Sequence, residues 1–164
     1  MIERVSTPTD EIVEQLTELY IATFSAPPRN EEIDSAEIRL LMIKEITEGD
    51  VHVIFDASTQ KLIGSLSIVP IAHFKDRARF KLQTGLYISN FMVDTETRGK
   101  GIGKQLLHAA LSEAQQEIHT RCRVDALAVN HLFSTHGFEL VANYTTTMNG
   151  SVAERNIYTY NAKR

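Results

Sequence analysis

The stretch Arg98-Gly99-Lys100-Gly101-Ile102-Gly103 decides how this chain folds, because the period of the apolar residues changes across it. Upstream, residues 87–93 are rich in β-branched and aromatic side chains, which predicts a strand. Downstream, apolar residues recur at every fourth position over residues 102–118, which predicts an amphipathic helix about four turns long. The local order is therefore strand, short turn, glycine-rich loop and helix.

This order suits an anion-binding loop. The glycines let backbone N–H groups turn toward one point, because no Cβ atom obstructs them. The first turn of the following helix adds unpaired donors and the positive end of the helix dipole. Arg98, Lys100 and Lys104 add positive charge. The combination predicts a phosphate or pyrophosphate site, and a plain glycine-rich helix start with surface cations stays open as the alternative.

Two familiar phosphate-binding patterns do not fit the loop. In the P-loop pattern the first glycine would fall on Arg98, and Gln105 takes the place of the required serine or threonine. The dinucleotide pattern G-x-G-x-x-G would need a glycine at Lys104 or Leu106. Residues 98–103 match Arg/Gln-x-x-Gly-x-Gly/Ala instead.

With that pattern the chain resembles the GNAT superfamily of acyl-CoA-dependent N-acyltransferases. The resemblance continues upstream through Val93-Asp94-Thr95-Glu96-Thr97, and downstream to Asn130 and Thr135-His136-Gly137-Phe138-Glu139. It implies one GNAT-like α+β (mixed α/β) domain over residues 1–164. The expected sheet is central, mixed, mostly antiparallel and twisted, with six or seven strands, a splayed parallel pair in the middle and helices on both faces.

The resemblance also implies acetyl-CoA as the co-substrate. In the family, the loop and the helix start grip the pyrophosphate, and the pantetheine arm bonds the backbone of the first parallel strand like an added strand. Asn130 matches the family's asparagine at the exit of the second parallel strand, although an N-cap role explains it equally well. The implied cofactor-binding residues are Phe91, Met92, Val93, Arg98, Gly99, Lys100, Gly101, Ile102, Gly103 and Asn130.

Acyl transfer to an amine needs a neutral amine, a stabilised carbonyl oxygen and a leaving thiolate. The resemblance implies direct attack on the thioester in a ternary complex, with the backbone of residues 91–93 polarising the carbonyl. The family's acid tyrosine falls on Phe133, which has no proton to donate. Water, Tyr87 or Tyr144 is the substitute acid, and Ser89 is a candidate to hold a water that relays the amine proton.

The family's carboxylate base would lie on the central strand and face the acceptor. The corresponding region here offers Tyr87, Ser89 and Asn90. Our leading hypothesis is an N-acetyltransferase that acts on a primary amine of a small molecule or peptide. The alternative, motivated by Phe133, is a catalytically weak or inactive acyl-CoA-binding sensor or regulatory domain. An unrelated nucleotide-binding domain is the third hypothesis.

Length and composition narrow the partners and the compartment. The 164 residues suit one domain, and 43% hydrophobic with 23% charged residues is ordinary for a globular protein. A net charge of −4 argues against a nucleic-acid partner and mildly favours a cationic acceptor such as an amine. We expect no membrane partner and a cytoplasmic location, because we find neither an apolar run near the ~20 residues of a membrane span nor a signal peptide.

The cysteine and the histidines of the chain indicate whether a disulfide, a reactive thiol or a metal site is expected. Cys122 is the single cysteine, so no internal disulfide forms, and its place at the start of an apolar strand predicts a buried inert thiol. The six histidines show no ligand spacing, so we expect no metal. We expect His108 and His119 to face solvent on the helix after the loop, and His52 to pack in a strand.

The rest of the chain supplies the remaining elements. Thr7 is the predicted N-cap of a first helix, and a second helix starts near Asn30 or Asp34 and stops at Gly49. A short helix is expected over residues 131–136. Strands are expected at residues 2–5, 51–55, 62–69, 124–129, 139–147 and 156–161.

Three connections carry further expectations. Residues 72–85 predict an exposed strand extension or a solvated charged loop. Asn149-Gly150 is a hairpin signal between the two closing strands, whose edge offers a route to a possible homodimer. By the resemblance, the Pro27-Pro28 loop and the second helix are candidates to select the acceptor.

Overall fold

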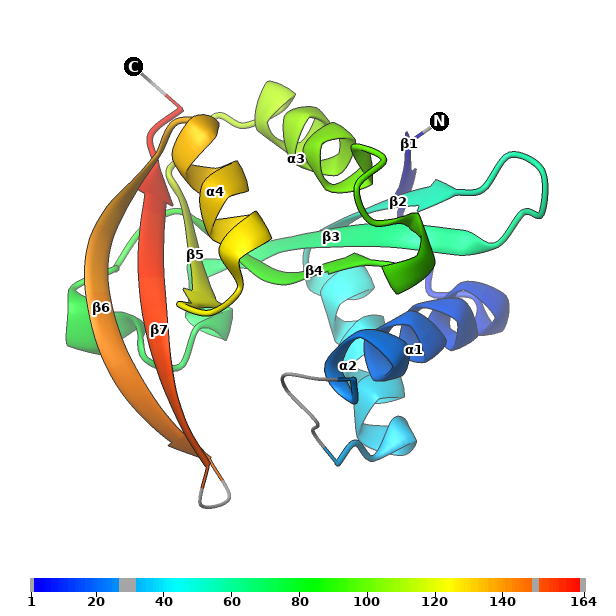
Figure 1. Cartoon of the computed structure of the whole chain (residues 1–164), viewed down its shortest axis with the longest axis horizontal. Helices are drawn as coiled ribbons and strands as arrows, with labels where there is room; N and C mark the ends of the chain where they lie inside the picture. Colours follow the sequence, from blue (N-terminus) through cyan, green and yellow to red (C-terminus); the bar gives the residue numbers. More distant parts are fainter. Residues whose placement is uncertain (1, 27–31, 149–150, 163–164) are drawn as a thin grey trace. The chain divides into compact units, whose positions relative to one another are not determined.

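The computed structural model describes residues 2–26, 32–148 and 151–162. In chain order its elements are β1 (Ile2–Val5), α1 (Asp10–Phe24), α2 (Ser35–Glu48), β2 (Asp50–Phe55), β3 (Leu62–Pro70), η1 (Ile71–His73), η2 (Arg77–Phe80), β4 (Leu86–Val93), η3 (Thr95–Thr97), α3 (Ile102–Ser112), β5 (Ile118–Arg123), α4 (Leu127–Thr135), β6 (Phe138–Met148) and β7 (Ser151–Tyr160), where η marks a 3₁₀-helix (Figure 1).

The strands of this described part form a mixed sheet in the order β1-β2-β3-β4-β5-β7-β6. Strands β4 and β5 run parallel, whereas the pairs β1-β2, β2-β3, β5-β7 and β6-β7 run antiparallel. Strands β4 and β5 are connected through α3, and a connection of this kind allows two strands of one sheet to run parallel. The predicted fold class, a mixed and mostly antiparallel sheet with a parallel pair in the middle, is confirmed.

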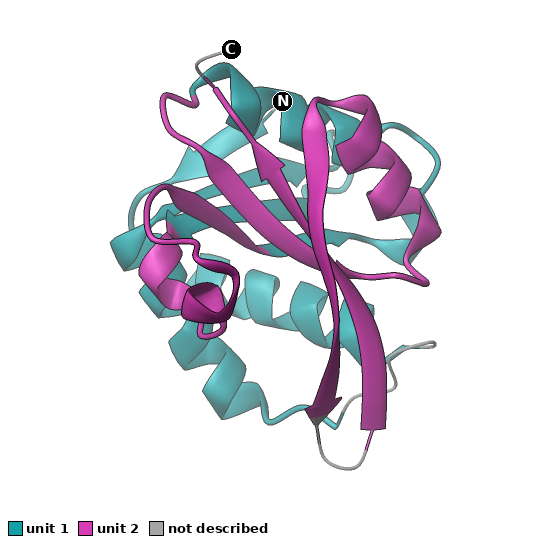
Figure 2. Ribbon diagram, turned by 90° about the vertical axis from the view of Figure 1, so that its left-hand side faces the viewer, with its two compact units in different colours: residues 1–69, 90–113 teal, residues 70–89, 114–164 magenta. Residues whose placement is uncertain are grey.

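The chain divides into two compact units (Figure 2). Residues 1–69 and 90–113 form the first unit, and residues 70–89 and 114–164 form the second. The boundary passes through β4, whose first half belongs to the second unit and whose second half belongs to the first. The prediction of a single domain over residues 1–164 stays a prediction.

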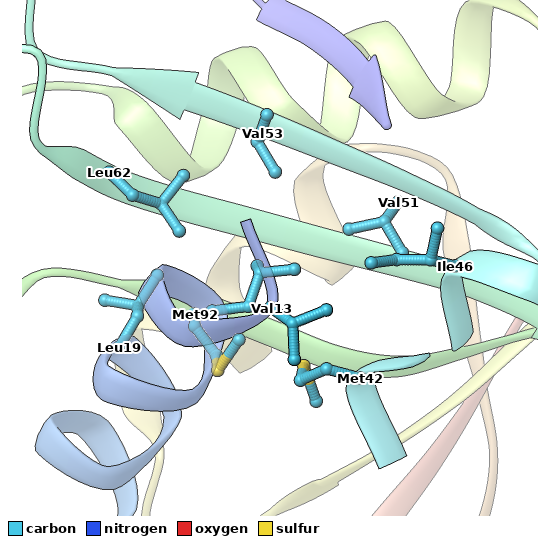
Figure 3. Packing of buried hydrophobic residues seen from close by; sticks show 9 residues of the cluster. Val13, Leu19, Met42, Ile46, Val51, Val53, Leu62 and Met92 are labelled. Carbon is cyan, nitrogen blue, oxygen red and sulfur yellow. The ribbon is translucent and has the colours of Figure 1, made fainter. Parts of the chain in front are cut away.

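The first unit has helices on both faces of its strands. Alternate residues of a strand face opposite sides of a sheet. On one side, Val53 of β2 belongs to a buried core cluster with α1 and α2 (Figure 3). On the other side, Gly64 of β3 pairs with Ile54 and lies against Ile102 at the start of α3. The close approach at Gly64 therefore fixes the beginning of α3 to the sheet.

The second unit is built on β5, β6, β7 and the first half of β4. Ile118 of β5 pairs with Leu86 of β4 on one side and with Tyr160 of β7 on the other. Strands β6 and β7 pair along nearly their whole length, with a register shift between Leu140 and Ala142. None of the described helices is long and apolar enough to span a bilayer.

The two N-terminal helices follow the capping signals, with one correction. Helix α1 is capped by Thr9, whose Oγ1 accepts the Ile12 N–H at 3.3 Å, and not by Thr7. With this cap, Asp10 and its neighbour Glu11 fall in the first turn, where the helix dipole favours acidic side chains. Helix α2 is capped by Asp34, as one of the two predicted starts proposed. The Pro27-Pro28 loop lies outside the described residues.

Residues 113–129 differ most from the prediction. Helix α3 ends at Ser112, so the helix predicted through residue 118 is too long, and residues 118–123 form β5. Strand pairing on both sides of Ile118 buries its side chain completely and overrides the helical spacing. The predicted strand at 124–129 is wrong, because α4 starts at Leu127. A short apolar run does not by itself distinguish a strand from a helix.

The expectations for the connection at residues 72–85 and for three histidines can be compared with the structure. Residues 72–85 are not a strand extension, because the segment holds the 3₁₀-helices η1 and η2. His119 does not face solvent from a helix but is buried in β5, where Nδ1 lies 2.8 Å from Thr159 Oγ1 and Nε2 lies 3.0 Å from the Thr84 carbonyl oxygen. His108 is exposed and His52 is buried in a strand, as predicted. The Asn149-Gly150 turn lies outside the described residues.

We expect Gly49→Ala to destabilise the fold by about 1–3 kcal/mol, the usual range for forcing extra atoms into a packed interior. A Cβ at this position would fall against the Ile68 carbonyl oxygen and 2.8 Å from Val69 Cγ1, at the junction of α2 and β2. Urea unfolding measures the loss. Leu40→Ala on the same helix α2 is the control, because its side chain is 69% exposed and packs against little. A Gly49→Ala protein as stable as the wild type would contradict this account.

We expect stability to fall below about pH 6.5 because of His52. Burial lowers the pKa of His52 from 6.5 and outweighs the opposite effect of Glu113, whose Oε2 lies 3.8 Å from Nε2. The unfolded chain therefore takes up this proton first as the pH falls. The contribution of neutral His52 to the free energy of unfolding is therefore complete above the pKa that His52 has in the unfolded chain. It is lost as the pH falls toward the lower pKa of the folded protein, by no more than ~1.4 kcal/mol per pH unit.

Urea unfolding at about pH 7.5 and about pH 5.5 measures this loss. His52→Gln should flatten the pH dependence, whereas His108→Gln, on the exposed face of α3, should leave it unchanged. An identical slope in His52→Gln and wild type would show that another group titrates.

Candidate active site

Asp94 fixes the start of the loop between β4 and α3. Its backbone N–H donates to the Ile63 carbonyl oxygen at 2.8 Å, which ties the exit of β4 to β3. Its carboxylate caps η3 by accepting a hydrogen bond from the Glu96 N–H at 3.2 Å. The same carboxylate forms an ion pair with Lys61, whose Nζ lies 2.9 Å away. Burial pushes the pKa of Asp94 up, but the bonds from Lys61 and Glu96 prevail and hold it below 3.8.

Gly99 and Gly101 give the loop an open backbone. Their φ angles are +83° and +79°, in the left-handed region that side chains disfavour. A Cβ atom built at either glycine would meet nothing within 4 Å. These glycines therefore leave free space beside the backbone, whereas Gly49 and Gly64 are needed because other atoms press against them.

The backbone donors of this loop are available. Among the described residues, the N–H groups of residues 101–104 form no hydrogen bond, and the first bond of α3 runs from Gln105 N to the Gly101 carbonyl oxygen at 3.0 Å. Arg98, Lys100 and Lys104 are exposed around them. The buried side chains of Ile102, Leu106 and others hold α3 against the sheet. Fixed donors, the positive helix end and three cations form an arrangement that can hold a pyrophosphate.

In the strand segment that leads into the loop, backbone groups rather than side chains could contact a ligand. The Met92 side chain is fully buried in the core of the first unit (Figure 3), and Phe91 and Val93 are half-buried. The chain passes directly from Val93 to Asp94 and the loop. The predicted role of residues 91–93, which depends on backbone groups, is compatible with this burial and stays a prediction.

Asn130 lies in the second unit and is not at a strand exit. Strand β5 ends at Arg123, and Asn130 sits inside α4, whose N-cap is Ala126. The predicted N-cap role is therefore wrong. Its amide instead joins α4 to β5 and β7: Nδ2 donates to the carbonyl oxygens of Arg123 and Ala126, each at 2.8 Å, and Oδ1 accepts from Tyr158 at 2.7 Å, Asn156 at 2.9 Å and Cys122 at 3.3 Å. Its cofactor role stays a prediction and would compete with these bonds.

The substitute acids are held in packed surroundings. Burial raises the pKa of Tyr87 to about 12, and its ring stacks on Phe74 at 4.7 Å. Burial also raises the pKa of Tyr144, whose hydroxyl accepts from Arg121 at 2.8 Å and donates to Asp76 at 3.2 Å. Ser89, the predicted water holder, is half-buried on β4. Tyr87 and Tyr144 share the second unit with Arg121.

Phe133 is a core residue. It is 1% exposed, and its ring centroid lies 4.9 Å from that of Phe138 and 5.6 Å from that of Tyr158. Cys122 is also no nucleophile, because burial raises the pKa of its thiol to about 12. Among the described residues, no three His, Cys, Asp or Glu side chains gather as metal ligands would.

Sequence reasoning missed Glu45. This residue of α2 is 1% exposed, and its Oε2 accepts a hydrogen bond from Asn90 Nδ2 on β4 at 2.7 Å. The signal was present, because Glu45 falls between Met42 and Ile46 on the apolar stripe of α2. A carboxylate on the buried face of a helix is rare unless a hydrogen bond or an ion pair satisfies it.

Comparison with known proteins identifies the family of this chain. Residues 13–138 match the family described as the Acetyltransferase (GNAT) family. The fold is similar to that of Arabidopsis thaliana NAA60 in complex with a bisubstrate analogue, at 15% identity, a TM-score of 0.75 and 98% coverage of both chains. It is also similar to a ribosomal-protein-alanine N-acetyltransferase from Brucella melitensis, at 16% identity, a TM-score of 0.76 and coverage of 98% of this chain and 99% of that one.

An N-acetyltransferase from Staphylococcus aureus Mu50 is similar at 13% identity and a TM-score of 0.73, over 100% of this chain and 99% of that one. A search of curated protein sequences finds no significant match. At such identities the solved structures bear on the fold alone, whereas the family match covers well over half of the sequence. The chain therefore belongs to the Acetyltransferase (GNAT) family, which makes it an acetyl-CoA-dependent N-acetyltransferase.

Proposed function

We propose that residues 98–103 and the first turn of α3 bind the pyrophosphate of acetyl-CoA, and that the acetyl group passes to a primary amine by direct attack in a ternary complex. The observation that carries the proposal is the set of N–H groups at residues 101–104, which make no hydrogen bond within the described part of the chain. Unpaired donors at a helix start bind anions without rearrangement. Because these donors are held in place by the fold, the loop can bind the pyrophosphate without changing its conformation.

The chemistry follows from what the chain offers. Backbone groups of residues 91–93 polarise the thioester carbonyl, so that charge develops on an oxygen that is already hydrogen-bonded. The amine nitrogen forms the new C–N bond, the C–S bond breaks and the thiolate leaves. Water is the proton donor to that thiolate, because Phe133 has no proton, Tyr87 is buried with a pKa of about 12, and the Tyr144 hydroxyl already donates to Asp76. A direct attack is favoured over an acyl-enzyme, since the Cys122 thiol also has a pKa of about 12.

The acceptor is an amine of a small molecule or a peptide. Among proteins of similar fold, one is named as a ribosomal-protein-alanine N-acetyltransferase, and the NatC complex was solved bound to Gag peptide and CoA. Those names support the inclusion of peptide N-termini beside polyamines, amino acids and aminoglycosides in an acceptor panel. The alternative, an acyl-CoA sensor without turnover, is favoured by the burial of Phe133 in the acid position.

We expect acetyl-CoA to stabilise the protein where ATP and NAD do not. A ligand at ~100 times its Kd adds ~2.7 kcal/mol, which raises Tm by very roughly 5–10 °C for a domain of this size. Differential scanning fluorimetry measures the shift. An equal shift with ATP or NAD would favour the unrelated nucleotide-binding domain. Thiol release with the amine panel then separates enzyme from sensor, because a sensor binds acetyl-CoA and releases no thiol.

We expect Gly101→Val to raise the Kd for acetyl-CoA about tenfold or more, because the added side chain fills the space beside the donors. The strain of a left-handed side chain costs ~1–2 kcal/mol of stability in addition. Gly137→Val is the matched control, because Gly137 also has a positive φ, of +87°, but lies after α4 in the second unit. Isothermal titration measures the Kd of both variants. Unchanged affinity in Gly101→Val would move the site elsewhere.

A further inference from the structure

The core between α2 and the sheet of the first unit contains polar groups. Glu45 of α2 and Asn90 of β4 are joined by a hydrogen bond of 2.7 Å, and we call them the Glu45–Asn90 pair. Ser65 and Ser67 of β3 pair with Val53 and Val51 and so face the same side of the sheet. Both serine hydroxyls are buried without a hydrogen bond among the described residues. Buried hydroxyls without a hydrogen bond cost stability, whereas the facing atoms of the Glu45–Asn90 pair satisfy each other.

The Glu45–Asn90 pair fixes which way the Asn90 amide points. A carboxylate oxygen accepts hydrogen bonds, so the bond to Glu45 Oε2 requires the NH₂ group of Asn90 on that side. The amide oxygen Oδ1 must then point away from Glu45. In the described part of the chain, Oδ1 of Asn90 accepts no hydrogen bond. The strand therefore carries an oriented carbonyl oxygen that can accept an N–H from a ligand.

Exposure separates the roles of the two residues. Asn90 is 8% exposed, whereas Glu45 is 1% exposed. A ligand can therefore reach Asn90, whereas the buried Glu45 can influence a ligand through Asn90. Asn90 also directly precedes residues 91–93, whose backbone we propose as the contact for the thioester carbonyl. An amine hydrogen-bonded to this amide would lie next to the bond that it attacks.

We propose that Asn90 Oδ1 accepts one N–H of the acceptor amine and that Glu45 is the positioning residue that keeps this oxygen oriented. The proposal rests on the proposed function and adds the group that holds the acceptor. Its ligand class is a primary amine, because one N–H binds the amide oxygen while the nitrogen lone pair attacks the thioester. Asn90 takes no proton. When the C–N bond forms and the thiolate leaves, the extra proton on nitrogen passes to water.

The test measures steady-state thiol release with acetyl-CoA and the most active amine of the acceptor panel. Asn90→Ala should raise the amine KM about tenfold, which corresponds to the ~1.4 kcal/mol of one hydrogen bond. Glu45→Gln should raise it about threefold to tenfold, because a glutamine can present either its oxygen or its NH₂ group and no longer fixes the amide. The Kd for acetyl-CoA, from isothermal titration, should stay within twofold of wild type in both variants.

Ser67→Ala is the matched control, because it removes another buried polar group from the same face and should change neither constant. If Asn90→Ala does not fold, Asn90→Thr replaces it, since threonine suits a strand and lacks the amide. An amine KM and kcat unchanged in the Asn90 variant overturn the proposal. Equal losses in Ser67→Ala also overturn it, because they indicate a general effect on packing.

Two results separate this proposal from the proposed function. Wild-type protein that binds acetyl-CoA but acetylates no amine overturns the role of Asn90 and leaves the loop's role in place. Wild-type protein that does not bind acetyl-CoA overturns the loop's role as well.

Discussion

The hydrogen bonds of Asp94 are the constraint on which the site depends. They tie the end of β4 to β3 and to Lys61, and η3 carries the chain from there to the glycines. Because α3 is packed on the sheet at Gly64, the loop is held at both of its ends. A loop held in this way keeps its donors in place before a ligand arrives, so binding loses little conformational entropy.

In the two proposals above, strand β4 would contact the two substrates through different groups. The buried Met92 side chain anchors the strand in the core, and the proposed contact with the thioester is made by the backbone there. Its side chain at Asn90 is held by Glu45 from α2. Under our proposal, an amide hydrogen-bonded to a carboxylate takes the place of the carboxylate base that the resemblance implies on this strand. A neutral group at this position suits an amine that must be neutral to attack.

The sequence predicted the elements whose signals are local. The strands that became β1, β2 and β3 and the glycine loop follow from residues close together in the chain, and one of the two expected starts of the second helix, Asp34, is its N-cap. The prediction failed over residues 113–129, where the spacing of Ala114 and Ile118 continued a helix that the structure ends at Ser112. Pairing of Ile118 with β4 and β7 decided that segment, and neither partner is close in sequence. Asn130 was misplaced for the same reason, since it binds β7 residues that lie far along the chain.

By itself, the sequence determined the strand, glycine-rich loop and helix and the identity of the family, because a short run of permissive glycines and the apolar spacing of the helix after it are local signals. Only the tertiary structure decided how β5 and α4 divide the segment after α3, how Tyr87 and Tyr144 are held, and that Glu45 meets Asn90. These outcomes depend on contacts between residues tens of positions apart. Such contacts arise from packing and burial, which local patterns of polarity do not encode.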